Sequence, residues 1–406
     1  MKAITCRRLI DGVSNDPIDD GVVLIEEDTV TKVGHREEVD IPASAEVIDY
    51  SDNVVIPGLV DAHVHLHGVN SHNPQTRMTE DATVGTARAT NDLRKLIQAG
   101  FTTVRDAGSK TGLGLRTVVE EGTIPGPRIY TAGLRFSQTA GHGDIHSLPY
   151  DWVTSGYAPI YSVLTDGADE CRKEARKQIR RGVDLLKIMT TGGLISEKDD
   201  PTDVHFTPEE IRVFAEEAHR HDIPLACHAQ GAEGAKVALR NGVDTIEHGN
   251  HLDDEGIELL VEKDAILVTT LALLDKFAKY GDEHDVPTKA VRKSREARET
   301  HIDAITRAYE AGASIAMGTD TTGTPLMEHG KNGYELELLV DAVGMNNMEA
   351  IQASTSVAAQ TVGDEPIGCL TSGHFADFVV LEEDPLEDIT AIYEIAEVYK
   401  GGEVAI

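Results

Sequence analysis

Cysteine, aromatic residues and long apolar runs are all scarce in this sequence, and each scarcity excludes a class of protein. The four cysteines, Cys6, Cys171, Cys227 and Cys369, are far apart and form no C-x-x-C pair. We therefore expect reduced thiols in a cytoplasmic protein. No stretch approaches the roughly 20 apolar residues that span a bilayer, and the N-terminal M-K-A-I-T-C-R-R-L-I is typical of a strand rather than a secretion signal. Aromatic residues make up 4% of the chain, so small apolar side chains must fill the core.

Basic residues are also few: 37 Lys and Arg stand against 70 Asp and Glu, for a net charge of -33. So acidic a surface argues against nucleic acid or an anionic membrane as a partner. It also repels itself, and salt shortens the range of that repulsion from about 10 Å at 0.1 M to about 3 Å at 1 M. We expect a halophilic, salt-adapted protein; an ordinary acidic enzyme is the alternative.

The two ends of the chain share a pattern of short apolar strands separated by turns. Near the N-terminus these include A-I-T-C-R-R-L-I and G-V-V-L-I-E, and near the C-terminus A-D-F-V-V-L and E-I-A-E-V-Y-K. This texture predicts antiparallel strands. We expect residues 1–57 and 365–406 to form one small β-sandwich domain built from both termini, with a separate C-terminal hairpin as the competing interpretation.

Between the ends, residues 58–364, short apolar strands alternate with helical segments, which predicts an α/β fold with a parallel sheet. One helix start is clear in T-P-E-E at residues 207–210, with Pro at the first turn. Eight strands in this span indicate a (β/α)8 TIM-like barrel, whose chemistry sits at the C-terminal ends of the strands. The expected strands are residues 60–66, 102–106, 128–132, 185–189, 224–228, 245–248, 266–270 and 314–318.

Polar side chains recur at those strand ends. His63 and His65 are two residues apart, so on a strand they point to the same face and can converge on a metal ion. Lys187 interrupts the apolar strand L-L-K-I-M, where an unpaired charge is expensive. A lone histidine is more often a hydrogen-bonded structural residue, and an aspartate can simply cap a helix. The joint occurrence of six such residues at the expected strands nevertheless predicts a catalytic site there: His63, His65, Lys187, His228, His248 and Asp320.

These motifs resemble those of the amidohydrolase superfamily over nearly the whole chain. The resemblance rests on G-L-V-D-A-H-V-H-L, the strand-borne lysine, the two later histidines, G-T-D and the tail G-H-F-A-D-F-V-V-L. A-G-H-G-D at residues 140–144 and E-H-G-N-H-L-D-D-E-G look most like the prolidase-like branch, which includes Xaa-Pro dipeptidases and relatives of imidazolonepropionase.

The resemblance implies two divalent metal ions. His63, His65 and Asp320 would hold one, His228 and His248 the other, and Lys187, carboxylated to a carbamate, would bridge them. Imidazole and carboxylate ligands suit zinc, with manganese or cobalt also compatible. A metal-bridging hydroxide would attack the amide carbonyl, and Asp320 would carry the proton to the leaving nitrogen.

Residues around the metals are predicted with less support. By resemblance, His142 would hydrogen-bond the scissile carbonyl, although it could simply order a Gly-rich loop. Gln230 stands where many dipeptidase-like relatives carry tyrosine, which weakens the dipeptidase assignment. His329 and Tyr334 would line the mouth or be exposed. Residues 141–162 could form a lid.

Two neighbours of the histidine pair receive smaller roles. Asp61 is expected to support the metal ligands from behind. His67 is expected at the mouth of the site and not as a ligand.

The sequence thus predicts a hydrolase of C–N bonds acting on a small molecule, namely a dipeptide, an N-acyl amino acid or a cyclic amide. One alternative is an imidazolonepropionase-like hydrolase or a deaminase with a single metal and an unmodified lysine. Another is a catalytically silent scaffold. A sugar or nucleotide binder is disfavoured because G-L-G-L at residues 112–115 lacks the strand and helix context of a phosphate loop. A homo-oligomer is left open.

Overall fold

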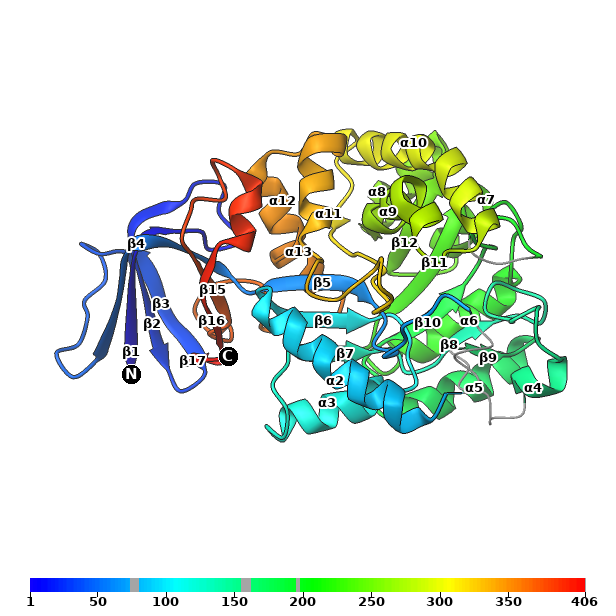
Figure 1. Cartoon of the computed structure of the whole chain (residues 1–406), viewed down its shortest axis with the longest axis horizontal. Coiled ribbons are helices and arrows are strands. Elements are labelled where there is room, and N and C mark those ends of the chain that lie inside the picture. Colours follow the sequence, from blue (N-terminus) through cyan, green and yellow to red (C-terminus); the bar gives the residue numbers. More distant parts are fainter. Residues whose placement is uncertain (74–79, 155–161, 195–197, 406) are drawn as a thin grey trace.

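The computed structural model describes residues 1–73, 80–154, 162–194 and 198–405. Strands from both ends of the chain form a seven-stranded sheet at one end of the molecule, beside a larger body of parallel strands and helices (Figure 1). The order of this terminal sheet is β17-β16-β15-β4-β1-β2-β3. Its strands are β1 (Lys2–Leu9), β2 (Ile18–Glu26), β3 (Thr29–His35), β4 (Glu46–Pro57), β15 (Phe378–Leu381), β16 (Ile395–Lys400) and β17 (Glu403–Val404).

The two termini meet where β15 pairs antiparallel with β4, with Phe378 opposite Pro57 and Leu381 opposite Val54. Both partners are apolar and buried along this seam, so pairing removes two hydrophobic edges from water. The predicted sheet from both termini is therefore confirmed, and the separate C-terminal hairpin is wrong. The predicted β-sandwich is not confirmed, because the described terminal strands belong to one sheet.

The central part of the chain is an α/β fold with parallel strands, as predicted. One sheet has the order β5-β6-β7 and the other β14-β13-β12-β11-β10-β8-β9. The first contains β5 (Leu59–Val64), β6 (Phe101–Asp106) and β7 (Arg128–Thr131). The second contains β8 (Arg135–Ser137), β9 (Ser162–Leu164), β10 (Leu186–Met189), β11 (Leu225–Gly231), β12 (Thr245–His251), β13 (Ile266–Val268) and β14 (Ile315–Ala316).

The single closed sheet expected of a barrel is not what the pairing shows. The ladder breaks between β7 and β8, where Gly133 has a φ of +62° that no extended strand adopts. Irregular backbone hydrogen bonds link β5 to the chain after β14: Ala62 N–H donates to the Met317 carbonyl at 3.0 Å, and Asp320 N–H to the His63 carbonyl at 2.8 Å. The strands that carry the predicted ligands are thereby held next to each other.

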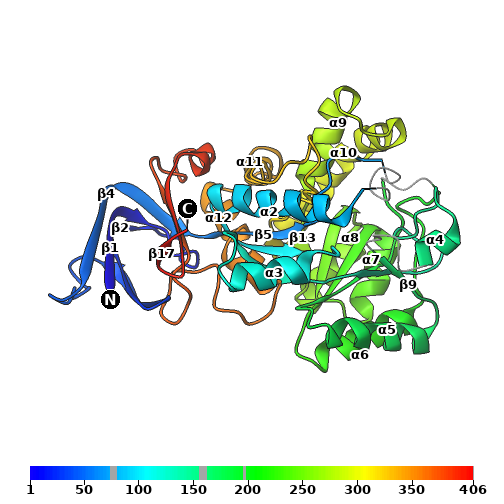
Figure 2. The same cartoon turned by 60° about the horizontal axis from the view of Figure 1, so that its bottom comes forward.

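Helices pack around the parallel strands (Figures 1 and 2). The predicted helix start at Thr207 is confirmed: its side chain and that of Glu210 cap each other's backbone N–H groups, with Pro208 in the first turn. No helix among the described residues is long and apolar enough to span a membrane. The longer helices are α2 (Ala82–Gln98), α3 (Gly112–Glu120), α5 (Ala168–Arg180), α6 (Pro208–His219), α7 (Ala232–Arg240), α8 (Asp254–Lys263), α9 (Leu271–Tyr280) and α10 (Thr288–Glu310).

Shorter helical segments complete the connections. The chain after β14 returns to the terminal sheet through four of them. The short helices are α4 (Tyr150–Thr154), α11 (Tyr334–Leu338), α12 (Asn347–Ala353) and α13 (Ser356–Gln360), with η1 (Gly281–Glu283), η2 (Leu339–Val343) and η3 (Ile389–Tyr393).

Candidate active site

The six predicted ligands line one cavity of about 310 Å³. They come from β5, β10, β11 and β12 and from the segments just after β5 and β14. Neighbouring parallel strands run side by side in one direction, which is why residues up to 257 positions apart in sequence can meet. The lining ligands are His63, His65, Lys187, His228, His248 and Asp320.

His63, His65 and Asp320 form the tightest group. His65 Nε2 lies 3.2 Å from Asp320 Oδ1 and His63 Nε2 lies 3.7 Å from the same oxygen. One ligand atom from each residue lies within 4.8 Å of the others, a spacing that fits a single metal ion, and among the described residues no other such trio occurs. Two nitrogens and a carboxylate oxygen suit zinc and similar divalent ions.

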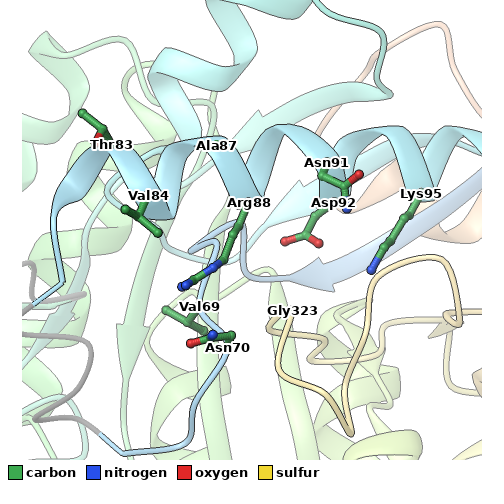
Figure 3. Close-up of a pocket in the computed structure, with 10 residues that line it drawn as sticks. All are labelled: Val69, Asn70, Thr83, Val84, Ala87, Arg88, Asn91, Asp92, Lys95 and Gly323. Carbon is green, nitrogen blue, oxygen red and sulfur yellow. The ribbon is translucent and has the colours of Figure 1, made fainter.

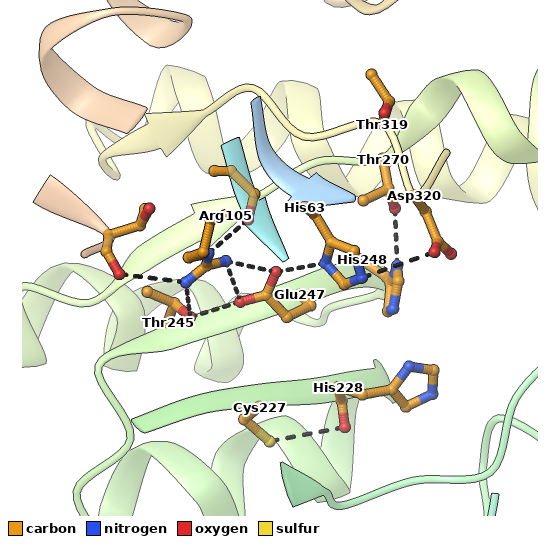
Figure 4. A network of polar contacts seen from close by, with 12 residues as sticks. His63, Arg105, Cys227, His228, Thr245, Glu247, His248, Thr270, Thr319 and Asp320 are labelled. Atoms are coloured by element: carbon orange, nitrogen blue, oxygen red, sulfur yellow. Dashed lines mark hydrogen bonds and ion pairs between the residues drawn. The ribbon is translucent and has the colours of Figure 1, made fainter. Parts of the chain in front are cut away.

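His63 is held from behind by a buried charged pair (Figure 4). Its Nδ1 lies 2.6 Å from Glu247, whose carboxylate accepts two hydrogen bonds from Arg105 at 2.7 and 2.8 Å. Burial alone raises the pKa of Glu247, but the charges of Arg105 and Lys187 hold that pKa well below its ordinary value. A carboxylate on Nδ1 fixes the ring and leaves Nε2 for a metal ion.

The histidines of β11 and β12 are oriented in the same manner. Nδ1 of His248 lies 2.7 Å from the Thr270 hydroxyl, and Nε2 of His228 lies 3.3 Å from the Gly192 carbonyl. The two rings lie 4.6 Å apart between centroids, and His248 lies 5.0 Å from His63. These contacts leave Nε2 of His248 and Nδ1 of His228 as the nitrogens available for a second ion.

Lys187 is the buried amine around which these ligands gather. It is 2% exposed, and its Nζ has no hydrogen-bond partner among the described residues. Burial lowers the pKa of Lys187 to about 8, so the neutral amine is accessible near neutral pH. A buried amine that lines the same cavity as the histidine ligands fits the expected conversion to a metal-bridging carbamate.

Burial favours the neutral form of His63, His228 and His248, which is the form that binds a metal ion. Burial lowers the pKa of His63 to about 4 and places those of His228 and His248 well below the ordinary value. Burial by itself raises the pKa of Asp320, but the neighbouring histidines, His65 first, outweigh it and lower that pKa. A set of neutral imidazoles and one ionised carboxylate matches the protonation state that metal binding requires.

The backbone at the strand ends is unusual. His248, Thr270 and Asp320 have φ values of +75°, +58° and +54°, in the left-handed region that non-glycine residues seldom adopt. Each departure costs of order 1–3 kcal/mol, and such strain concentrates at functional sites. Two of these residues, His248 and Asp320, line the cavity, and the third is the threonine that contacts His248.

Some predicted neighbours of the metal site lie where expected. His142 and Gln230 line the cavity. The His142 ring stacks on His228 at 4.4 Å between centroids, and its Nδ1 lies 3.7 Å from Asp199. Gln230 is 5% exposed, and within the described part of the chain its Oε1 has no hydrogen-bond partner. Both residues can therefore reach a substrate.

Other predicted neighbours do not reach the cavity. His329 is buried, with Nε2 3.2 Å from the His65 carbonyl, and it is not a lining residue. Tyr334 likewise does not line it, and donates to Asp275 at 2.6 Å. The described part of the proposed lid, residues 141–154 and 162, contributes lining residues at 142 and 144–147; residues 155–161 lie outside the described residues.

Asp61 and His67 fit their expected supporting places. Asp61 is buried and accepts from the backbone N–H groups of His63 and Thr319 at 3.0 and 3.2 Å, so it ties two ligand-bearing segments together. His67 lines the cavity, with its ring stacked 5.0 Å from that of His65. The sequence reasoning missed Glu247 and Arg105; a buried acid beside His248 in T-I-E-H-G was the available signal.

Comparison with known proteins places this geometry in a family. A model of the Amidohydrolase family matches residues 54–405. The chain belongs to the amidohydrolase family. This confirms the resemblance, and the chain is a hydrolase acting on C–N bonds, so the silent-scaffold alternative is set aside.

Individual relatives of this amidohydrolase agree with that assignment. Ochratoxinase from Aspergillus niger is 34% identical over 410 residues, 96% of this chain and 83% of the relative. Its crystal structure superposes with a TM-score of 0.90 and 31% identity, covering 99% of this chain and 95% of that one. A Xaa-Pro dipeptidase with bound methionine in its active site gives a TM-score of 0.89 and 30% identity over 99% of both chains. Imidazolonepropionase from Deinococcus deserti is 24% identical, covering 92% of this chain and 88% of the relative.

The amidohydrolase also has a groove beside α2, outside the ligand cluster (Figure 3). Asp92 lines it, is 6% exposed, and has a pKa that burial raises to about 7. The Asp92 carboxylate lies close to Gly323. A Cβ atom at position 323 would lie only 2.9 Å from Asp92 Oδ2, so a larger residue than glycine would require a shift.

We expect Asp92→Asn to stabilise the protein, and increasingly so as the pH rises. The folded state keeps the Asp92 proton up to about pH 7, whereas the unfolded chain releases it near pH 4. Between these values the wild-type free energy of unfolding falls with pH, and the variant escapes this loss, on the order of 1–4 kcal/mol above pH 7. Urea unfolding from pH 4 to 8 measures the difference. The exposed Asp341→Asn is the control; an equal gain there, or a pH-independent gain at Asp92, contradicts the expectation.

Proposed function

We propose that this amidohydrolase cleaves the amide bond of a dipeptide or N-acyl amino acid with the help of two divalent metal ions, zinc in the first instance. His63, His65 and Asp320 would hold one ion and His228 and His248 the other, with Lys187 bridging as a carbamate. The observation that carries the proposal is the buried Nζ of Lys187, without a partner among histidine ligands. Carbamate formation adds carbon dioxide to the neutral amine and releases one proton. The lysine side chain then carries a negative charge, which suits binding to two metal cations, and the cost of a buried ammonium is removed.

Each residue then has a task in hydrolysis. The ions, when bound, acidify a water molecule toward neutrality and polarise the substrate carbonyl. Asp320, ionised and 3.2 Å from His65 Nε2, would accept a proton from the attacking water and deliver it to the leaving nitrogen, which departs only when protonated. His142 hydrogen-bonds the carbonyl oxygen as negative charge develops on it.

The cavity wall supports a small, anionic substrate with an apolar part. Arg135 and Lys289 line the cavity in a chain whose net charge is -33, so the wall presents two cationic side chains to a substrate carboxylate. Leu273, Leu274 and Phe277 line another part. A single-metal imidazolonepropionase-like or deaminase reaction is disfavoured by Lys187, because that reaction leaves the buried lysine without a use.

A substrate survey tests this function. We expect the zinc-loaded protein to hydrolyse Xaa-Pro dipeptides or N-acyl amino acids in molar KCl, and chelation to abolish the activity, with recovery on adding zinc. Activity confined to cyclic amides or to deamination, or activity that survives complete metal removal, contradicts the proposal.

Several broader features of the molecule belong to the same proposal. We infer that residues 58–364 act as a (β/α)8-type catalytic domain and that residues 1–57 and 365–406 form the smaller domain. A cytoplasmic location and any homo-oligomer stay predictions.

Salt adaptation is a separate inference from the charge of -33. Because concentrated salt screens repulsion among surface carboxylates, we expect the melting temperature to rise steadily from dilute buffer to 2 M KCl. Differential scanning calorimetry at matched pH measures it, and 2 M of an uncharged osmolyte serves as the comparison for effects other than screening. A melting temperature in dilute buffer equal to that in molar KCl contradicts salt adaptation.

A further inference from the structure

Helices α9 and α10 form a hairpin that builds one wall of the cavity. The two helices pack against each other, and η1 connects to α9 at the turn (Figure 2). The hairpin contributes apolar and polar lining residues: Leu273, Leu274, Phe277, Pro287, Lys289 and Ser294. No other helical pair of the described chain supplies so many of the cavity's residues.

The hairpin has a hydrophobic core of its own. Leu273, Leu274 and Phe277 cluster with Val291 and Ala297 of α10, apart from the main core. Leu194, from the loop after β10, joins the same cluster and also lines the cavity. The apolar wall is thus a separate packed unit, and its cavity-facing side chains are held by neighbours and not by the parallel strands.

The base of the hairpin is anchored to the ligand-bearing strands. The buried Glu335 carboxylate accepts from the N–H groups of Leu271 and Ala272, the first residues of α9, at 2.7 Å each. This satisfies donors at the helix start that otherwise lack partners. The preceding residue, Thr270, holds His248. The start of α9 is therefore fixed relative to one predicted metal ligand.

An ion pair and buried hydrogen bonds fix the position of the rest of the hairpin. Asp275 of α9 pairs with Arg298 of α10 at 2.7 Å. Lys293 of α10 is 6% exposed and donates to the carbonyls of Gly193 and Asp199 at 3.3 and 3.1 Å. These contacts tie α10 to the loop that carries Leu194. A wall anchored at both ends presents a fixed apolar surface.

We propose that this hairpin, with Phe277 at its centre, selects substrates that carry a large apolar group beside the scissile amide. The inference rests on the proposed amide hydrolysis and adds the substrate class. The predicted metal ligands come from the parallel strands and the segments after them, whereas the hairpin supplies apolar side chains that can contact an apolar group of the substrate. Phe277 is 2% exposed and its ring lies 5.3 Å from that of His72, edge to face, so an aromatic face and apolar neighbours meet in one place.

The test compares three substrates of the zinc-loaded, full-length protein: N-acetyl-alanine, N-benzoyl-alanine and N-acetyl-phenylalanine. The first substrate carries no large apolar group. The second carries one on the acyl side of the scissile amide, and the third carries one on the amine side. We expect at least one aromatic substrate to exceed N-acetyl-alanine in kcat/KM by about 10-fold or more. Phe277→Ala should reduce that ratio by about 10- to 100-fold.

Val291→Ala is the matched control, because Val291 packs in the same apolar cluster and does not line the cavity. It should keep the ratio even if it lowers the melting temperature. An unchanged ratio in Phe277→Ala, or an equal fall in both variants, overturns the proposal.

A binding measurement separates this inference from the proposed chemistry. If the wild type cleaves none of the three substrates, the proposed amide specificity fails. Calorimetry with 3-phenylpropionate then decides the hairpin's role: binding weakened about 10-fold or more in Phe277→Ala but not in Val291→Ala supports it, and equal binding by all three proteins overturns it.

Discussion

Replacing Lys187 with alanine is expected to lower kcat by roughly 1000-fold or more, equivalent to about 4 kcal/mol of activation free energy. On the proposed function, the substitution removes the amine whose carbamate would supply negative charge to both metal ions. Neighbouring ligands would remain, since His63 and His248 are held by Glu247 and Thr270 and not by the lysine. The expected result is therefore weak retention of one ion and loss of the second.

Chemical rescue sharpens this expectation. Formate, acetate or propionate added to Lys187→Ala should restore part of the activity by supplying the missing carboxylate, with saturation as the acid concentration rises. Lys236→Ala is the matched control, because Lys236 is also buried but pairs with surface acids on α7 and α8. A fully active Lys187→Ala variant, or equal rescue of the control, would remove the lysine from the proposed site.

Asp320→Asn is expected to lower kcat by about 10²- to 10⁴-fold, the usual contribution of a positioned proton carrier. Asparagine keeps an oxygen near His65 but cannot accept a proton at neutral pH. Metal content should fall less than activity, because two histidines of the same trio remain. Inductively coupled plasma analysis and single-turnover kinetics on the same sample separate the two effects.

The buried acid Asp92 offers a control for this substitution, since it lies in the α2 groove away from the ligands. Asp92→Asn should retain turnover. Retained turnover in Asp320→Asn would show that another group moves the proton, whereas a parallel loss of metal and activity would make Asp320 a ligand only.

The sequence predicted the six lining residues because each lies in a parallel strand or just beyond one, where the architecture brings side chains of neighbouring strands together. It also predicted the joining of the two termini, since apolar alternation at both ends calls for a shared sheet. The break between β7 and β8 was not predictable in the same way, because the φ of Gly133 depends on the packing of neighbouring strands.

The supporting network was harder to foresee for a similar reason. Arg105 and Glu247 are 142 positions apart, and nothing local to either residue shows that they pair across the fold. His329 illustrates the opposite failure: its place after β14 indicated the cavity mouth, yet its ring turns to the His65 carbonyl. The Phe277 wall also depends on how α9 and α10 pack, which helix patterning alone does not determine.

The central claim is a two-metal centre bridged by a modified Lys187, and metal stoichiometry tests it most directly. Native mass spectrometry of zinc-reconstituted protein prepared with bicarbonate should show two ions per chain and one added carbon dioxide, with activity rising in step with the second ion. Full activity with one ion per chain and an unmodified lysine would contradict the account.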